Sequence, residues 1–191
     1  AVASQLSSGV SQIISNYFAF AALKADGSVV AWGDPSNGGD SSAVASQLSS
    51  GVSQIFSNFY DAFAALKTDG SVVTWGSRAN GGDSSVAASQ LSSGVSQIFS
   101  NWNSFAALKA DGSVVTWGWH EYGGDSSAVA SQLSSGVSQI FSTAYAFAAL
   151  KADGSVITWG FGGDSSAVAS QLSSGVSQIF STDYALSLIH I

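Results

Sequence analysis

Residues 63–76 read Phe-Ala-Ala-Leu-Lys-Thr-Asp-Gly-Ser-Val-Val-Thr-Trp-Gly, and this stretch decides the fold. It holds two short runs rich in valine, phenylalanine and tryptophan, Phe63–Lys67 and Ser71–Trp75, which are typical of β-strands. Between them, Asp69 and Gly70 supply the positive φ that a tight hairpin requires. The stretch therefore predicts a β-hairpin with Asp69 and Gly70 in its turn.

The residues on either side extend this hairpin to a small sheet. Val52–Ser57 is a third run of strand-forming residues and predicts a strand that precedes the hairpin. Gly-Gly-Asp-Ser-Ser at 81–85 follows the hairpin, and we expect a fourth, shorter strand after it. The segment Ala-Val-Ala-Ser-Gln-Leu at 43–48 favours a turn or two of helix closed by Gly51.

The same unit recurs along the chain. Four complete copies and half of a fifth follow one another, and a Trp-Gly pair stands at the same place in each complete copy. Together they form one repeat domain. The repeats are 1–42, 43–85, 86–127, 128–166 and the partial repeat 167–185.

Apolar residues point to both faces of each predicted sheet. Ile55 and Phe56 are adjacent, as are the two valines of Val72–Val73, so each sheet must be covered on two sides. Small sheets stacked face against face satisfy this requirement, with the small pair Ala64–Ala65 letting neighbours approach, and a β-propeller is such a stack bent into a ring. A β-solenoid is the alternative, but its coils are shorter, at roughly 20 to 30 residues. We therefore expect an all-β array of propeller-like blades, each partnered by the neighbouring repeats of the same chain.

The order Phe-Ala-Ala-Leu, Asp-Gly, Val-Val-Thr-Trp-Gly and Gly-Gly-Asp resembles the repeat of the regulator of chromosome condensation family. The resemblance covers all four complete repeats and half of the fifth, and it implies one propeller blade per repeat. Three features depart from the family's pattern: the histidine before the Ala-Leu strand is absent, the repeat is shorter, and the exit reads Gly-Gly-Asp instead of Gly-Gln-Leu-Gly. A nucleotide-exchange role is not implied, because the family's surface loops and chromatin-binding tail have no match here.

Composition argues against several classes of partner. Twelve acidic residues against five basic ones give a net charge of −7, so nucleic acid and anionic membrane surfaces would repel the chain. No stretch reaches the roughly 18 apolar residues of a membrane-spanning helix, and we expect no membrane insertion. The chain has neither cysteine nor methionine. We expect the natural protein to be longer at both ends.

The C-terminus departs abruptly from the repeat. Leu-Ser-Leu-Ile-His-Ile at 186–191 stands where the repeat predicts Phe-Ala-Ala-Leu-Lys-Ala. These six residues are the translation of CTG TCT CTT ATA CAC ATC, which resembles a transposase mosaic-end adapter used to prepare sequencing libraries. We therefore predict that residues 186–191 are adapter read-through, with a divergent capping strand as the alternative. A genomic copy that encodes these residues and then a stop codon would contradict this prediction.

The chain offers little for catalysis. It has no cysteine, one glutamate, Glu121, and two histidines, of which His190 lies in the departing tail. His120 and Glu121 are neighbours in a loop whose equivalents in the other repeats carry neither residue, which favours a solvated loop histidine over an acid–base pair. We expect neither an enzyme nor a cofactor.

A recurring aspartate is the feature that points to a metal site. Calcium takes six or more oxygen ligands, and one carboxylate per repeat with serine hydroxyls is a thin supply. A turn or cap formed by Asp-Ser-Ser is therefore the preferred interpretation. The weak calcium candidates are Asp40, Asp83, Asp125 and Asp164.

Four tryptophans at the end of the predicted third strand mark the core. Their recurrence in every complete repeat favours packing between blades over a platform for a ligand. They are Trp32, Trp75, Trp117 and Trp159, accompanied by Leu23, Leu66, Leu108 and Leu150.

Variation between the repeats gathers in two loops. Because antiparallel strands alternate in direction, the loop between the first two strands and the loop after the third emerge on one side, opposite the Asp-Gly turns. Both loops are rich in aromatic residues, which suit recognition of a protein or a carbohydrate because they offer large contact area at small entropic cost. Drift in loops whose rings plug the blade ends is the alternative. The candidate binding residues are Tyr17, Phe59, Tyr60, Trp102, Trp119, His120, Tyr122, Tyr145 and Phe161.

The sequence thus favours a non-catalytic binding or scaffolding module of a large surface or secreted bacterial protein. One alternative is a cytoplasmic protein-interaction propeller. The other is a calcium-stiffened spacer of an adhesin. Flanking sequence would separate the three, because a signal peptide, calcium-binding repeats or adhesion modules would each point to one of them.

Overall fold

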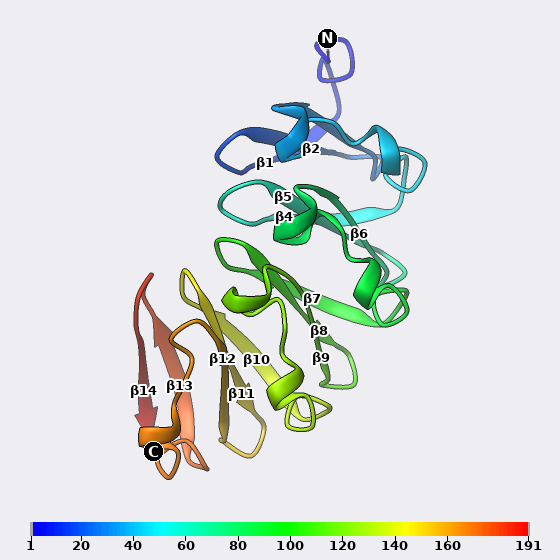
Figure 1. Ribbon diagram of the computed structural model, residues 1–191. Helices are drawn as coiled ribbons and strands as arrows, with labels where there is room; N and C mark the ends of the chain where they lie inside the picture. The colour runs from blue at the N-terminus through cyan, green and yellow to red at the C-terminus, as the bar shows by residue number, and fades with distance from the viewer. Residues whose placement is uncertain (1, 191) are drawn as a thin grey trace.

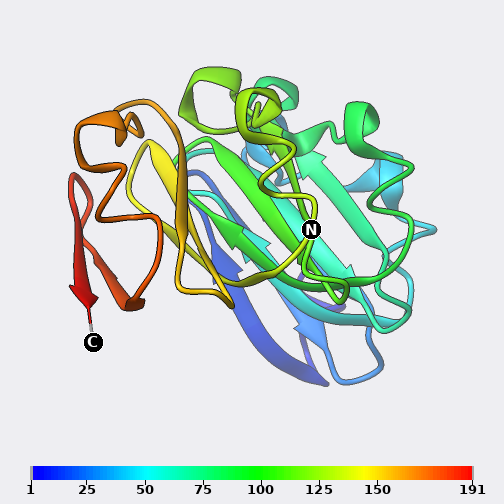
Figure 2. The same ribbon diagram turned by 90° about the horizontal axis from the view of Figure 1, so that it is seen from below.

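The protein is a curved stack of small antiparallel sheets, seen from two directions in Figures 1 and 2. The computed structural model describes residues 2–190. Ala1, Ile191 and the side chains of Leu186, Leu188 and His190 lie outside the described part, so the predicted read-through segment and its histidine are covered only in part.

Four three-stranded blades and a two-stranded half-blade follow one another in chain order. Short helical turns lie between the strands of successive blades, mostly along one edge of the array (Figure 2). The strands are β1 (Val10–Ser15), β2 (Ala19–Lys24), β3 (Val29–Gly33), β4 (Val52–Ser57), β5 (Ala62–Lys67), β6 (Val72–Gly76), β7 (Val95–Ser100), β8 (Ser104–Lys109), β9 (Val114–Gly118), β10 (Val137–Ser142), β11 (Ala146–Lys151), β12 (Val156–Gly160), β13 (Val176–Ser181) and β14 (Leu186–His190). The helical turns are η1 (Pro35–Asn37), η2 (Ser42–Val44), η3 (Arg78–Gly82), η4 (Ser85–Ala87), η5 (His120–Tyr122), η6 (Ser127–Val129) and η7 (Ser166–Val168).

The central hairpin forms as predicted. Phe63 pairs with Trp75 across β5 and β6, and Gly70 has a φ of +78° in the turn between them. The carboxylate of Asp69 accepts hydrogen bonds from the Ser71 amide at 2.9 Å and the Ser71 hydroxyl at 2.6 Å. These bonds lower the pKa of Asp69, so the turn favours the charged form.

Both faces of a blade are covered by its neighbours, which confirms the stacking prediction. Ala65 and Phe63 pack in one apolar cluster with blade 1, whereas Ala64 packs in a second cluster that includes Phe105 of blade 3. Ala64 and Ala65 are both fully buried. The small side chains therefore let three sheets approach at one point.

Three of the four recurring tryptophans, Trp75, Trp117 and Trp159, belong to these interblade clusters. Trp75 stacks on Phe63, with ring centroids 5.2 Å apart, and its Nε1 donates to the carbonyl of Gly38 in the preceding blade at 3.1 Å. Trp117 repeats both contacts with Phe105 and Gly81 and is fully buried. The core role predicted for the tryptophans is confirmed for Trp75, Trp117 and Trp159. Trp32 of blade 1 is only partly buried and lies in none of the clusters formed by the described residues.

The prediction of a fourth strand after Gly-Gly-Asp-Ser-Ser is wrong. The described part of this connector holds the single 3-10 turn η4, and it then runs along the outer edge of β6, where the Val72 amide donates to Leu91 O at 3.0 Å. The turn or two of helix expected at 43–48 is a single 3-10 turn, η2, and Gly51 follows it with a φ of +75°. The connector thus covers part of the β6 edge without pairing as a strand.

First strands contact first strands of neighbouring blades, and this places them on the inner side of the curve. A serine at the end of each first strand links one blade to the next. Ser57 Oγ donates to Ser15 O at 2.8 Å, Ser100 Oγ to Ser57 O at 2.8 Å, and Ser142 Oγ to Ser100 O at 2.9 Å. We call this series the serine ladder. Among the described residues, no helix is long and apolar enough to cross a membrane.

Candidate functional site

The two variable loops of each blade meet on one side of the stack, as predicted. In blade 2, the buried Asn58 joins them, because its Nδ2 donates to Asn80 O in the exit loop at 2.7 Å. Its Oδ1 accepts from the amides of Asp61 and Ala62 at 3.0 and 2.9 Å. One side chain therefore fixes both loops of the blade.

Sequence analysis did not single out this asparagine, although the repeats carry a signal for it. Asn16, Asn58 and Asn101 stand at the same position in the three blades whose exit loops are long. Thr143 replaces them in blade 4, whose exit loop is short, and its hydroxyl bonds only within its own loop, to the amide and carbonyl of Ala146.

Rings from these loops contact one another in one continuous cluster. Phe59 lies 5.9 Å from Tyr17 and 5.2 Å from Trp102 between ring centroids, and Trp102 lies 5.1 Å from Tyr145. Tyr122 continues the series, 4.8 Å from Tyr145. All nine candidate binding residues lie in this cluster, together with two rings beside them. We call it the aromatic face, and it comprises Tyr17, Phe18, Phe59, Tyr60, Trp102, Trp119, His120, Tyr122, Tyr145, Phe161 and Tyr184.

Backbone bonds tie together the loops that carry the aromatic face. The Tyr17 amide donates to Phe59 O at 3.0 Å, and the Trp102 amide donates to Ala144 O at 3.1 Å. The Ala144 amide in turn donates to Asp183 O at 2.8 Å. Each loop is thereby held against the loop of the next blade, so the rings sit on a fixed support.

Many of these rings remain open to solvent. Tyr184 is 74% exposed, Tyr17 69% and Phe161 65%, although each contacts another ring. Trp102 and Tyr145, at the centre of the cluster, are half-buried. A contiguous patch of exposed apolar side chains is more typical of an interaction surface than of an inert surface.

The surroundings of Tyr145 favour the neutral form of its phenol group. Desolvation raises the pKa of Tyr145, and the nearby hydroxyls of Tyr184, Tyr60 and Tyr122 raise it further. Four tyrosine hydroxyls therefore gather close enough to influence one another. They offer a ligand hydroxyl donors and acceptors beside apolar ring faces.

Asp61 lies at the edge of this surface in a half-buried position. Its Oδ2 accepts from Asn80 Nδ2 at 2.8 Å, whereas Asp61 Oδ1 and Asn80 Oδ1 are buried without a hydrogen-bond partner. Burial raises the pKa of Asp61, and the hydrogen bond from Asn80 opposes that shift in part. Two acceptor oxygens of this pair thus lack a donor.

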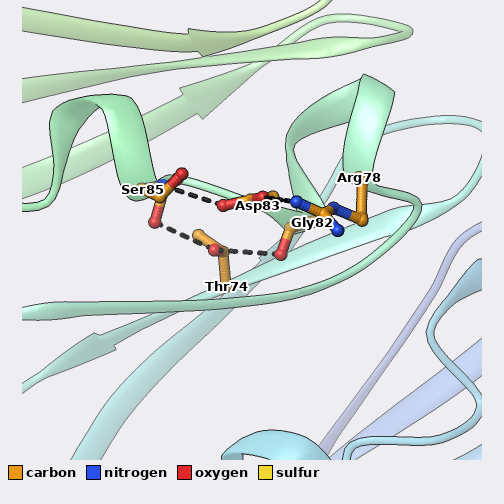
Figure 3. Close-up of polar contacts among 6 residues, drawn as sticks. Thr74, Arg78, Gly82, Asp83 and Ser85 are labelled. Atoms are coloured by element: carbon orange, nitrogen blue, oxygen red, sulfur yellow. Dashed lines mark hydrogen bonds and ion pairs between the residues drawn. The ribbon is translucent and has the colours of Figure 1, made fainter.

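The exit loop of blade 2 shows what the recurring aspartate does (Figure 3). One oxygen of Asp83 accepts from the Ser85 amide at 3.0 Å, and the other pairs with Arg78 at 2.8 Å. Thr74 Oγ1 lies 3.3 Å from Gly82 O and 3.0 Å from Ser84 Oγ. The carboxylate therefore organises a turn at the start of η4.

The other three calcium candidates occupy the same turn position. Asp40, Asp125 and Asp164 each accept from the amide two residues further on, at 2.8, 2.8 and 2.9 Å. These backbone bonds lower the pKa of all three carboxyls. Within residues 2–190, no three acidic or histidine side chains gather into a group that could hold a metal ion.

His120 and Glu121 lie in the exit loop of blade 3 and face solvent. His120 Nε2 is 3.8 Å from Glu121 Oε1, and both side chains are more than half exposed. The imidazole ring packs beside the Trp119 ring, with ring centroids 5.9 Å apart. His120 thus joins the aromatic face at its rim.

Further recesses lie elsewhere, along the outer edges of the blades. Grooves of about 650, 800 and 540 Å³ run beside β6, β9 and β12, and each is lined by the strand, by the connector that follows it and by residues of the preceding connector. Repeat residues such as Thr74, Thr116 and Thr158 line them, so these grooves are alike from blade to blade. Most of the variation between blades falls in the loops that carry the aromatic face, and we therefore take that face as the candidate site.

No protein-family model matches the sequence, and no curated protein matches it. Solved structures do resemble the fold. The ectodomain of the receptor kinase CR4 from Physcomitrella patens gives a TM-score of 0.52 at 15% identity, covering 93% of this chain and 46% of that one. Prp20p, the yeast RCC1 of Saccharomyces cerevisiae, gives 0.52 at 18% identity, covering 80% of this chain and 44% of that one.

The chain spans less than half the length of these two structures. Prp20p shares the propeller fold that the repeat pattern predicts, so the resemblance to the regulator of chromosome condensation repeat is confirmed for the fold. The protein is an all-β array of propeller-like blades.

Proposed function

We propose that the chain is a non-catalytic scaffold that binds a protein or a carbohydrate through the aromatic face. The observation that carries the proposal is the continuity of this face. Rings from the five loops that follow the first strands contact one another across four blades and the half-blade, while several of them stay exposed. Rigid rings on a supported backbone lose little entropy when a ligand covers them.

Two further observations support a binding role. The repeats agree at core positions and differ at the aromatic face, which is where a scaffold carries its specificity. Prp20p, which shares the fold, is described with binding to Gsp1p and histones, so this architecture can serve protein recognition. The net charge of −7 favours basic partners. A surface or secreted location is also part of the proposal, and CR4 shows the fold in an ectodomain.

The test compares a face variant with a matched surface variant. The face variant carries Tyr17→Ser, Phe59→Ser and Trp119→Ser, which remove three exposed rings. The control carries Val86→Ser and Val168→Ser, which remove exposed apolar side chains outside the aromatic face. Each protein is screened on an array of immobilised oligosaccharides and against a displayed peptide library, and its melting temperature is measured.

We expect a ligand that the unaltered chain and the control bind equally and that the face variant binds at least about tenfold more weakly, since interface rings often contribute over 1 kcal/mol each. The melting temperatures of the unaltered chain, the control and the face variant should stay close together. A ligand that the face variant still binds at full strength would overturn the proposal. A large fall in melting temperature with no ligand on either screen would instead assign the rings to stability.

A further inference from the structure

The third strand of an interior blade leaves part of its outer edge free. Strand β6 pairs with β5 alone among the described strands, and the bond from the Lys67 amide to Ser71 O sets the phase of that ladder. Because alternate residues of an antiparallel strand bond to the same side, the amides of Val72 and Thr74 point away from β5. The Val72 amide bonds Leu91 O, whereas nothing within residues 2–190 bonds the backbone amide or carbonyl of Thr74. Thr74 therefore turns a donor and an acceptor outward without a protein partner.

The edge of β9 repeats this arrangement one blade further along the stack. The Val114 amide bonds Leu133 O, and Thr116 stands in the place of Thr74, again with no backbone partner in the described part of the chain. Propeller blades are usually four-stranded, and these blades hold three strands. Two blades inside the stack thus leave part of the position of a fourth strand open.

A groove follows each of these two edges and lies between two connectors. Beside β6 it holds about 650 Å³ and is lined by residues 71–76, by Val44 of the preceding connector and by Leu91 of the next. Beside β9 it holds about 800 Å³, with Ala87 in the place of Val44. A single extended chain can enter between two connectors, whereas the edge of a second blade is flanked by connectors of its own. The groove therefore fits a chain segment and not a folded sheet.

The charged groups of the groove beside β6 already have partners. Asp83 pairs with Arg78 at 2.8 Å. Lys67 Nζ donates to Gln47 O at 3.0 Å, and the carboxylate of Asp40 accepts a backbone amide at 2.8 Å. The two acidic and two basic side chains that line this groove cancel in charge. A charged segment would lose hydration there without gaining an unpaired opposite charge, so the groove suits an uncharged one.

We propose that the grooves beside β6 and β9 bind an uncharged, extended segment of a partner protein, which pairs with the free edge as a fourth strand. The segment accepts from the Thr74 amide and donates to the Thr74 carbonyl, and Thr116 makes the same two bonds one blade further on. Main-chain pairing of this kind provides affinity, and pockets for alternate side chains provide specificity. The exchange of Val44 for Ala87 gives the two grooves different side-chain preferences. This surface is separate from the aromatic face, and the proposal does not depend on that face binding a ligand.

Amide hydrogen exchange of the unaltered chain, followed residue by residue by NMR, tests the free edge first. The amides of Val72 and Val114 are bonded and should exchange slowly, whereas those of Thr74 and Thr116 should exchange at least about tenfold faster. Equal protection at the valines and the threonines would mean that the edge is closed, and it would overturn the proposal.

A displayed library of short random peptides, selected on the same chain, then supplies the ligand. We expect an uncharged peptide that slows exchange at Thr74 or Thr116 and binds the aromatic-face variant as tightly as the unaltered chain. N-methylation of the peptide, one residue at a time, should weaken binding by about tenfold or more at alternate residues only, because every second amide faces the edge. A library without a binder, a peptide that needs the aromatic face, or losses that do not alternate would each contradict strand addition.

A matched pair of triple variants locates the binding on the protein. Thr74→Pro, Thr116→Pro and Thr158→Pro remove the outward amides of β6, β9 and the equivalent strand β12 without removing a bond to the middle strand. Valine at the same three positions keeps those amides and removes only the hydroxyls, such as the one that contacts Gly82 O and Ser84 Oγ.

The proline variant should bind the selected peptide at least about tenfold more weakly than the valine variant does. Circular dichroism checks that both variants are folded. Should the proline variant fail to fold, the N-methyl scan on the unaltered chain decides alone. Equal binding by two folded variants would overturn the proposal.

Discussion

Blade 1 and blade 3 are built from nearly the same residues, yet those residues do different things in the two places. Ile98 and Phe105 are fully buried in blade 3, whereas Ile13 and Phe20 of blade 1 are about half exposed. Trp117 is sealed between blades, while Trp32 has no described blade on its outer side. The contribution of a repeat residue to stability therefore depends more on the neighbouring blade than on its own blade.

The tryptophans give the sharpest form of this comparison. Trp117→Ala removes a buried ring and its hydrogen bond to Gly81 O, and we expect it to lower the free energy of unfolding by about 3 to 5 kcal/mol. Trp32→Ala removes a half-exposed ring and should cost about 1 kcal/mol. Urea unfolding of both variants measures the difference. Equal costs would mean that neighbouring blades add nothing to the role of this residue.

The exit-loop glycines extend the comparison to the backbone. Gly81 has a φ of +103°, and a Cβ there would lie 2.7 Å from Phe105, so Gly81→Ala combines backbone strain with a clash and should cost about 2 to 4 kcal/mol. Gly162 has a φ of +74° and open space, so Gly162→Ala should cost about 1 kcal/mol from strain alone. Thermal melts of the two variants rank them. The reverse order would contradict the packing described for the interior loop.

The loop asparagines test the effect of burial on one hydrogen-bond pattern. Asn101→Ala leaves buried groups in both loops of blade 3 without partners and should cost about 2 kcal/mol. Asn16 makes the same bonds in blade 1, to Asn37 O and from the Ala19 amide, but it is only partly buried. Because water can replace those bonds, Asn16→Ala should cost less than about 1 kcal/mol. Denaturant midpoints of the two variants decide, and a larger cost at Asn16 would be inconsistent with this account.

The smallest effect concerns Asp61, whose counterpart in blade 3 is Asn103. Since burial raises the pKa of Asp61 in the folded chain, its contribution to stability is present below the unfolded pKa and is lost as the pH rises through the folded pKa. Asp61→Asn also adds an amide donor next to Asn80, whose Oδ1 is buried without a hydrogen-bond partner. We expect this variant to be more stable at pH 7 by roughly 0.5 kcal/mol, after allowance for the solvent screening of a half-exposed group.

A pH series of melting temperatures checks this prediction. The advantage of Asp61→Asn should shrink towards acid pH, where the carboxyl of the unaltered chain is protonated in both states. A difference that does not change with pH would show that the charge of Asp61 is not its cause.

The repeat pattern predicted the parts of the fold that depend on local rules. The Asp69–Gly70 turn, the strands on either side of it and the buried tryptophans follow from turn chemistry and recurring apolar positions. The fourth strand failed because the connector meets the β6 edge through one carbonyl, Leu91 O, and side chains near Thr74, with no continuous pairing. Nothing in the sequence of one repeat reveals where its connector runs.

The sequence predicted which aromatic residues form the candidate site but not the asparagine side chains that hold its loops together. Strand direction alone placed the aromatic loops on one side, and the rings do form one cluster. Asn58 was not predicted because its Nδ2 bonds a backbone carbonyl 22 residues away, in a loop that looks variable. Only a comparison of loop length with residue type, Asn101 beside a long loop and Thr143 beside a short one, would have found it.

The serine ladder also determines how the array should respond to a pulling force. Ser57, Ser100 and Ser142 each join one pair of blades at the inner edge, so a force applied between the two ends of the chain loads these links in series. Among the described blades, a blade held by one such link has fewer interblade contacts than a blade held by two and should detach first. Stretching a tethered molecule should then lengthen it in steps, one blade at a time, with each blade releasing about 140 Å of chain.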